Sequence, residues 1–103
     1  MPKYLPTQSY LNAIASELDA FLMMTDHRYS DRNENVKRSE RISDILIGLS
    51  NPSYVKKVRS EIKYWYDRKL YDGLTYRVSG GRRAVKEDAE FLMDALSKML
   101  MRV

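Results

Sequence analysis

Cysteine is absent from the 103 residues of this chain, and histidine occurs only once. Without cysteine there can be no disulfide, no thiolate metal ligand and no thiol nucleophile, and such a composition fits a reducing compartment. The single histidine, His27, lies in a polar segment with no second imidazole that would share a metal ion or activate a nucleophile. We therefore expect no enzyme activity, no catalytic residues, no metal site and no cofactor.

A phosphate-binding glycine loop is missing as well. The adjacent glycines Gly80 and Gly81 precede Arg82 and Arg83, and this run has neither the Lys-Ser ending of a P-loop nor the GxGxxG spacing of a dinucleotide site. Nucleotide binding is therefore not expected.

Long apolar runs are also lacking. The first residues, MPKYLPTQSYL, do not contain the uninterrupted apolar stretch of a secretory signal, and no later segment approaches the ~20 apolar residues that cross a bilayer. We expect no membrane insertion and a cytoplasmic location.

What the sequence does contain is a globular composition with an uneven charge. Apolar residues make up 44% and charged residues 31%, which are values for a folded chain, and the length predicts one domain over residues 1–103. Residues 52–86 hold ten Lys or Arg against three acids, a local net charge of +7, whereas the rest of the chain is at −3. Such a stretch predicts contact with a polyanion or with an acidic partner.

Apolar residues recur at helical spacing in four segments. Thr7 can cap the first helix, whose apolar face consists of Leu11, Ile14, Ala15, Leu18, Phe21, Leu22 and Thr25. The polar run at residues 26–35 has no periodicity and is interpreted as a connection. The second helix is expected to start near Asn33 and to stop between Gly48 and Asn51, with an apolar face of Ile42, Ile45, Leu46 and Leu49.

The third helix starts at Pro52 and is expected to run to Asp72 and Gly73, where glycine can end it. Its core face consists of Val55, Val58, Ile62, Trp65 and Tyr66, so Trp65 is interpreted as a core anchor. The last helix has a seam of Val85, Ala89, Leu92, Leu96, Met99, Leu100 and Val103.

Residues 74–85 predict a short β-hairpin between these last two helices. Leu74, Tyr76 and Val78 alternate with polar residues, a Ser79-Gly80-Gly81 turn follows, and residues 82–85 form the second strand. The predicted fold is mainly α, a small domain of four helices with a short hairpin before the last helix.

The order helix, turn, helix, hairpin, helix resembles a winged helix-turn-helix DNA-binding domain of the kind found in MarR-like regulators. The resemblance covers residues 40–85: residues 48–53 are similar to the turn and start of a recognition helix, and residues 80–83 to a basic wing tip. It implies a small transcriptional regulator that binds duplex DNA as a dimer, with the first and last helices at the dimer contact. The alternative is a four-helix domain in which residues 48–52 and 79–81 are ordinary turns.

Two groups of residues are candidates for nucleic-acid contact. Residues at the start of the third helix would face base edges, because recognition helices enter the major groove by their N-terminal end: Asn51, Ser53, Tyr54, Lys56 and Lys57. Cations around the predicted hairpin would face phosphates: Arg77, Arg82, Arg83 and Lys86. The simpler interpretation is that Asn51 and Ser53 cap the helix and that the cations are solvated.

Tyr64, Arg68 and Tyr71 are predicted to form an outward stripe on the third helix, in line with Lys57. Tyrosine beside cations suits stacking on the bases of RNA or single-stranded DNA, and it also suits a protein interface. The second hypothesis is therefore a helical protein–protein interaction module that acts as a regulator or inhibitor of a larger, acidic partner.

Overall fold

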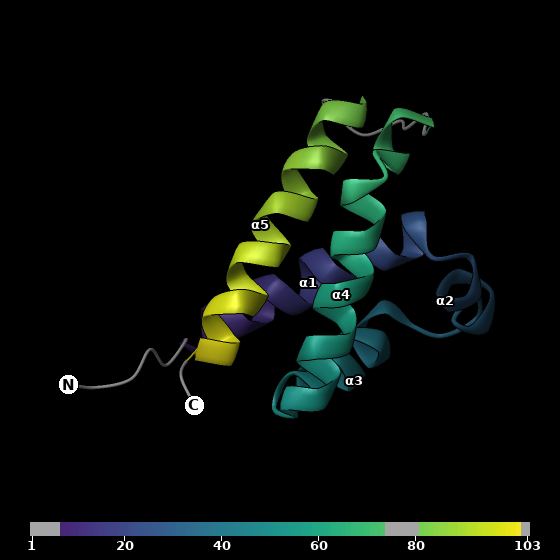
Figure 1. Ribbon diagram of the computed structural model, residues 1–103. Coiled ribbons are helices and arrows are strands. Elements are labelled where there is room, and N and C mark those ends of the chain that lie inside the picture. The colour runs from purple at the N-terminus through teal and green to yellow at the C-terminus, as the bar shows by residue number, and fades with distance from the viewer. Residues whose placement is uncertain (1–6, 74–80, 102–103) are drawn as a thin grey trace.

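The computed structural model describes residues 7–73 and 81–101, which form helices α1 (Gln8–Thr25), α2 (His27–Arg32), α3 (Arg38–Leu49), α4 (Pro52–Asp67) and α5 (Gly81–Met101), with a short 3-10 helix η1 (Leu70–Gly73) after α4. Figure 1 shows α4 and α5 side by side, with α1 crossing them and α2 and α3 at the other side of α4. Within the described ranges no helix combines the length and the apolar character needed to cross a bilayer.

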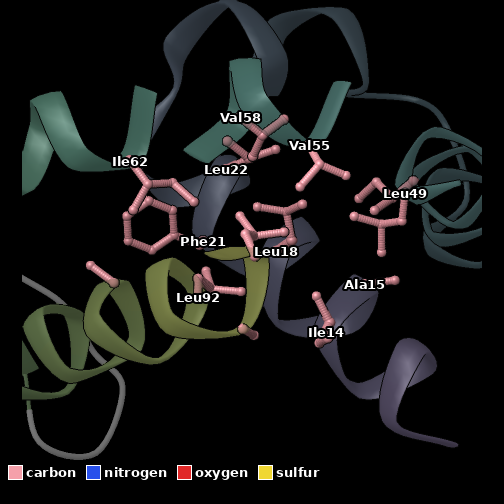
Figure 2. Packing of buried hydrophobic residues seen from close by; sticks show 14 of the residues in the cluster. Ile14, Ala15, Leu18, Phe21, Leu22, Leu49, Val55, Val58, Ile62 and Leu92 are labelled. Atoms are coloured by element: carbon pink, nitrogen blue, oxygen red, sulfur yellow. The ribbon is translucent and has the colours of Figure 1, made fainter. Parts of the chain in front are cut away.

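One hydrophobic core joins α1, α4 and α5. Leu18 of α1, Ile62 of α4 and Leu92 of α5 are almost completely buried, and Figure 2 shows their side chains pointing toward one another. Ile45 and Leu49 extend the core to α3. The centres of the apolar faces predicted from helical spacing are confirmed, because these are the residues that the packing buries. Six of the predicted positions are only partly buried, Leu11, Thr25, Ile42, Leu46, Tyr66 and Leu100, and Val103 lies outside the described residues.

Polar caps define three helix starts. The N–H of Tyr10 donates to Thr7 Oγ1 at 3.1 Å, which confirms the predicted start of the first helix. Asn51 Oδ1 accepts the N–H of Ser53 at 3.0 Å in front of Pro52, which confirms the start of α4. Asp26 Oδ1 accepts the N–H groups of Arg28 and Tyr29 at 3.0 and 3.2 Å, and these bonds begin α2.

The prediction that residues 26–35 form a connection is therefore wrong for α2. The helix has six residues, too few for an apolar period to show, and none of them is buried. Asn33 ends α2 and does not start the next helix, which begins at Arg38.

The third predicted helix is also shorter than expected. α4 ends at Asp67, and Lys69 adopts a left-handed conformation with φ 56° before η1 begins. A left-handed residue cannot continue an α-helix, so Asp72 and Gly73 do not belong to α4.

The predicted β-hairpin is wrong. Residues 81–85 belong to α5, where Val85 is in helical register with Ala89 and Leu92 and all three are fully buried. A residue in the helical conformation cannot at the same time be extended, so these residues do not form the second strand of a hairpin. The first half of the predicted hairpin, residues 74–80, lies outside the described residues. Residues 7–73 and 81–101 contain helices and no strand, so the fold is a small helical domain without the predicted wing.

Gly48 has a packing role that the resemblance did not predict. It lies in the last turn of α3, and a Cβ at this position would be 2.8 Å from Cδ2 of the Tyr54 ring. The aromatic ring of α4 therefore rests directly on the backbone of α3. Glycine is needed here for close approach.

Candidate functional site

The cations of α4 do not form the single surface that the charge of residues 52–86 suggested. Lys63 is paired with Asp67 at 2.6 Å on the helix surface. Arg59 Nε donates to Ser97 Oγ of α5 at 2.6 Å, so its guanidinium faces another helix of the domain. Lys56 and Lys57 are exposed. The charge is thus divided among several sides of α4.

The residues predicted to read base edges have three different environments. Asn51 and Ser53 belong to the helix cap, as the simpler interpretation had it. Tyr54 is half-buried against Gly48, and burial together with the nearby Glu61 carboxylate raises the pKa of its hydroxyl. Lys56 and Lys57 are exposed to solvent on this part of α4.

The residues predicted to contact phosphates are only partly described. Arg77 lies outside the described residues, and so do the side chains of Arg82 and Arg83, whose backbone belongs to α5. Lys86 is half-buried, with Nζ 5.7 Å from the centre of the Tyr71 ring.

The predicted tyrosine stripe separates into an exposed and a packed residue. Tyr64 is 59% exposed, and the guanidinium of Arg68 lies 4.4 Å from the centre of its ring. Tyr71 lies in η1 and packs on Trp65 with ring centres 5.7 Å apart. The two tyrosines therefore do not share one outward face.

An open pocket of about 460 Å³ lies between α1, α4 and η1, beside the start of α2. Its walls include Phe21, Leu22, Ile62, Tyr64, Trp65 and Leu70, and we call it the apolar pocket. The prediction that Trp65 is a core anchor is confirmed, since only 8% of it is exposed, and the same side chain also lines this pocket.

Aromatic packing shapes the floor of the apolar pocket. Phe21 and Trp65 meet edge to face, with ring centres 5.0 Å apart and planes at 77°. Tyr71 contacts both Trp65 and Tyr66, with each pair of ring centres 5.7 Å apart. Rings held on several sides are fixed in orientation, so the floor is preformed.

A second pocket of about 290 Å³ adjoins the first, and the two share Leu22, Asp26, Arg28 and Glu61. Its walls also include Tyr29, Arg32, Tyr54 and Lys57. Because Arg28, Arg32 and Lys57 converge here from α2 and α4, we call it the cationic pocket. Arg28 and Arg32 come from the helix that sequence analysis interpreted as a connection.

A buried ion pair positions α2 and thereby the cationic pocket. Asp19 of α1 is 1% exposed, and its carboxylate accepts hydrogen bonds from Arg41 Nε at 2.8 Å and Arg41 Nη2 at 3.2 Å. The Tyr29 hydroxyl of α2 donates to the same carboxylate at 2.7 Å. Burial and this bond raise the pKa of Tyr29, and the bonds to Asp19 raise the pKa of Arg41.

Sequence reasoning missed this ion pair, although a signal was present. Asp19 follows Ala15 by four residues and precedes Leu22 by three, which places it in the middle of the apolar face of α1. An acid in that position must be buried with a partner or must interrupt the face.

The described residues contain no group of three or more metal-ligating side chains. His27 lies 3.0 Å from Asp31, and both side chains are largely exposed. The candidate site consists of the apolar pocket and the cationic pocket beside it. Comparison with protein-family models, with curated proteins and with solved structures found no match for this chain.

Proposed function

We propose that this chain is a helical protein-interaction module whose apolar pocket receives an apolar side chain from a segment of a partner protein. The observation that carries the proposal is the preformed pocket of about 460 Å³, with Phe21, Ile62 and Trp65 in its walls. Pockets of this size bind side chains and small ligands by burying apolar surface.

The rim of the pocket favours a protein partner. Tyr64 and Leu70 are 59% and 46% exposed, so two large side chains with apolar surface are exposed to solvent at the opening of the apolar pocket. Exposed tyrosine and apolar residues around a concave site are typical of interfaces, where buried anchors contribute most of the affinity.

The polar groups of the lining do not favour a polar small molecule. Asp26 already accepts two backbone N–H groups of α2, and Thr25 donates its hydroxyl to the carbonyl of Phe21 at 2.8 Å. These two groups are engaged within the protein, and Arg28 and Glu61 lie at the border with the cationic pocket. Apolar contact is therefore offered by the walls of Phe21, Leu22, Ile62, Tyr64, Trp65 and Leu70. Burial of one Leu or Phe side chain would contribute about 1.5 to 3 kcal/mol to binding.

Trp65 makes the proposal testable, because it is the only tryptophan of the chain and it lines the pocket. The probes are tryptophan-free peptides that carry one Leu, Phe or Met in a serine- and alanine-rich sequence, together with a peptide that has alanine at that position. We expect a saturable change in Trp65 emission with the anchored peptides and none with the alanine peptide.

Two variants and one control locate the binding. Tyr64→Ala and Leu70→Ser should each weaken peptide binding by about tenfold, since each removes apolar rim contact. Ile47→Ser is the matched control, because Ile47 is 69% exposed on α3 and does not line the pocket. Equal loss in the control, or no emission change with any peptide, would overturn the proposal.

Binding of duplex DNA is a second candidate function, favoured by the exposed cations at the start of α4. Within the described ranges no carboxylate lies within 4.0 Å of Lys56 or Lys57. The test is the anisotropy of a labelled random-sequence duplex at several salt concentrations. If these lysines contact phosphates, the double variant Lys56→Gln/Lys57→Gln should reduce the slope of log affinity against log salt by roughly 2. Absence of binding at low salt would exclude this function.

A further inference from the structure

We propose that the partner segment is acidic, with a carboxylate side chain bound in the cationic pocket next to the apolar anchor. This inference rests on the proposed function and adds the chemistry of the partner. It follows from the contiguity of the two pockets, which share Leu22, Asp26, Arg28 and Glu61 as common walls. A segment that fills the apolar pocket therefore passes directly beside the cations of the second one.

The cations of the second pocket are available to a ligand. The Arg28 side chain is 87% exposed, and its nearest carboxylate contact is Asp26 at 4.0 Å. In the part of the chain that the structure describes, no carboxylate lies within 4.0 Å of Arg32 or Lys57. The charge in the pocket is thus only partly compensated by the protein itself.

The two acids of the lining do not cancel this charge. Asp26 uses its carboxylate to accept two N–H groups at the start of α2. Glu61 lies at the border between the pockets, where it is one of the causes of the raised pKa of Tyr54. Glu61 repels an acidic ligand at the border, where Arg28 attracts it, and Arg32 and Lys57 attract it inside the cationic pocket.

Arginine gives the site geometric selectivity as well as charge. A guanidinium can bind a carboxylate through two parallel N–H donors, which a point charge cannot do. Arg28 and Arg32 are four residues apart on α2, so they lie on one face of that helix. The partly buried hydrogen bond from Tyr29 to Asp19 holds α2 in place, so the backbone that carries the two guanidinium groups is fixed.

The test uses three tryptophan-free peptides with the same Leu anchor. One carries glutamates beside the anchor, one carries glutamines and one carries lysines at the same positions. Emission of Trp65 should give affinities in the order acidic, neutral, basic, with about tenfold between the acidic and the neutral peptide at low salt. The preference should shrink as salt is added, because exposed charges are screened.

Variants separate this inference from the proposed function. Arg32→Gln/Lys57→Gln should lower affinity for the acidic peptide more than affinity for the neutral peptide, so that most of the preference is lost. Lys56→Gln is the matched control, since Lys56 is exposed on the same helix and does not line this pocket. Glu61→Gln should strengthen binding of the acidic peptide, because it removes the repulsive charge at the border.

Three outcomes would overturn the inference. Equal affinity for acidic and neutral peptides would reject the acidic partner and leave the apolar pocket as the binding site. Failure of all three peptides would reject both proposals together. Displacement of the acidic peptide by a short random-sequence DNA duplex, lost in Arg32→Gln/Lys57→Gln, would assign the cationic pocket to nucleic acid.

Discussion

Arg41 of α3 binds the buried carboxylate of Asp19 in α1 through two guanidinium nitrogens, at 2.8 and 3.2 Å. A third nitrogen of the same guanidinium donates to the carbonyl of Val36 at 2.5 Å, in the turn before α3. One residue therefore joins α1 to α3 and to the preceding turn. Because the Tyr29 hydroxyl shares the carboxylate, α2 depends on the same charge.

Loss of one partner of this pair should destabilise the protein strongly. Asp19→Leu leaves Arg41 and the Tyr29 hydroxyl without their acceptor, and we expect the free energy of unfolding to fall by about 3 kcal/mol. The double variant Asp19→Leu/Arg41→Met should recover more than half of that loss, since an apolar pair of similar volume leaves no uncompensated charge. Urea unfolding followed by circular dichroism measures both; a double variant less stable than the single one would contradict the explanation.

Gly48→Ala should destabilise the protein, although alanine normally favours a helix. The added Cβ would lie 2.8 Å from Tyr54 Cδ2, so the ring must move, at a cost of about 1 to 2 kcal/mol. Ser43→Ala, at an exposed position of the same helix, is the control and should be neutral or slightly stabilising. Urea unfolding measures the stability that Gly48→Ala loses. This loss of stability should be smaller when Tyr54 is also replaced by alanine, and an unchanged loss would show that the Tyr54 ring is not its cause.

Much of the fold was predictable because core packing follows helical spacing. The apolar positions of the first helix, from Ile14 to Leu22, are the ones that the structure buries. The prediction of a hairpin failed because it depended on the short alternation of Leu74, Tyr76 and Val78. Val85 belongs to the helical apolar seam that continues through Ala89. A two-residue alternation over five residues is a weaker signal than the three- and four-residue spacing that extends over the whole last helix.

The candidate site was less predictable, since it depends on contacts between distant segments. Arg28 and Arg32 meet Lys57 only because α2 folds against α1, and six polar residues carry no periodic signal of that helix. The end of α4 was misplaced for a similar reason. A lysine in the left-handed conformation leaves no mark in the sequence comparable to a glycine.

Lys69→Gly should stabilise the protein by roughly 0.5 to 1 kcal/mol. Lys69 has φ 56°, a conformation in which a Cβ is unfavourable and glycine is not. Lys56→Gly is the control. It places glycine inside α4 and should lower the free energy of unfolding by about 1 kcal/mol. Thermal unfolding of the two variants compares them, and destabilisation by Lys69→Gly would contradict the backbone argument.

Glu17→Gln should stabilise the protein at neutral pH. Burial and the neighbouring Asp88 carboxylate raise the pKa of Glu17, so the folded state binds more protons than the unfolded state just above the ordinary glutamate value of about 4.5. The folded protein therefore loses stability as pH rises through the raised pKa. Glutamine removes that loss, and its advantage should disappear below about pH 4.5. Urea unfolding at acid and neutral pH tests this, with Glu34→Gln as the exposed control; an advantage that persists in acid would contradict the assignment.

The pairing of α1 with α5 has a consequence for how the chain folds. Most helix contacts join elements that are close in the sequence. α4 contacts its neighbours α3 and α5, and only the short α2 separates α1 from α3 in the sequence. The pair α1 and α5 spans nearly the whole described chain and closes its longest loop. Contacts between neighbouring helices can form first at little entropic cost. We therefore expect the domain to fold within microseconds to milliseconds, with the docking of α1 on α5 as the slow step of folding.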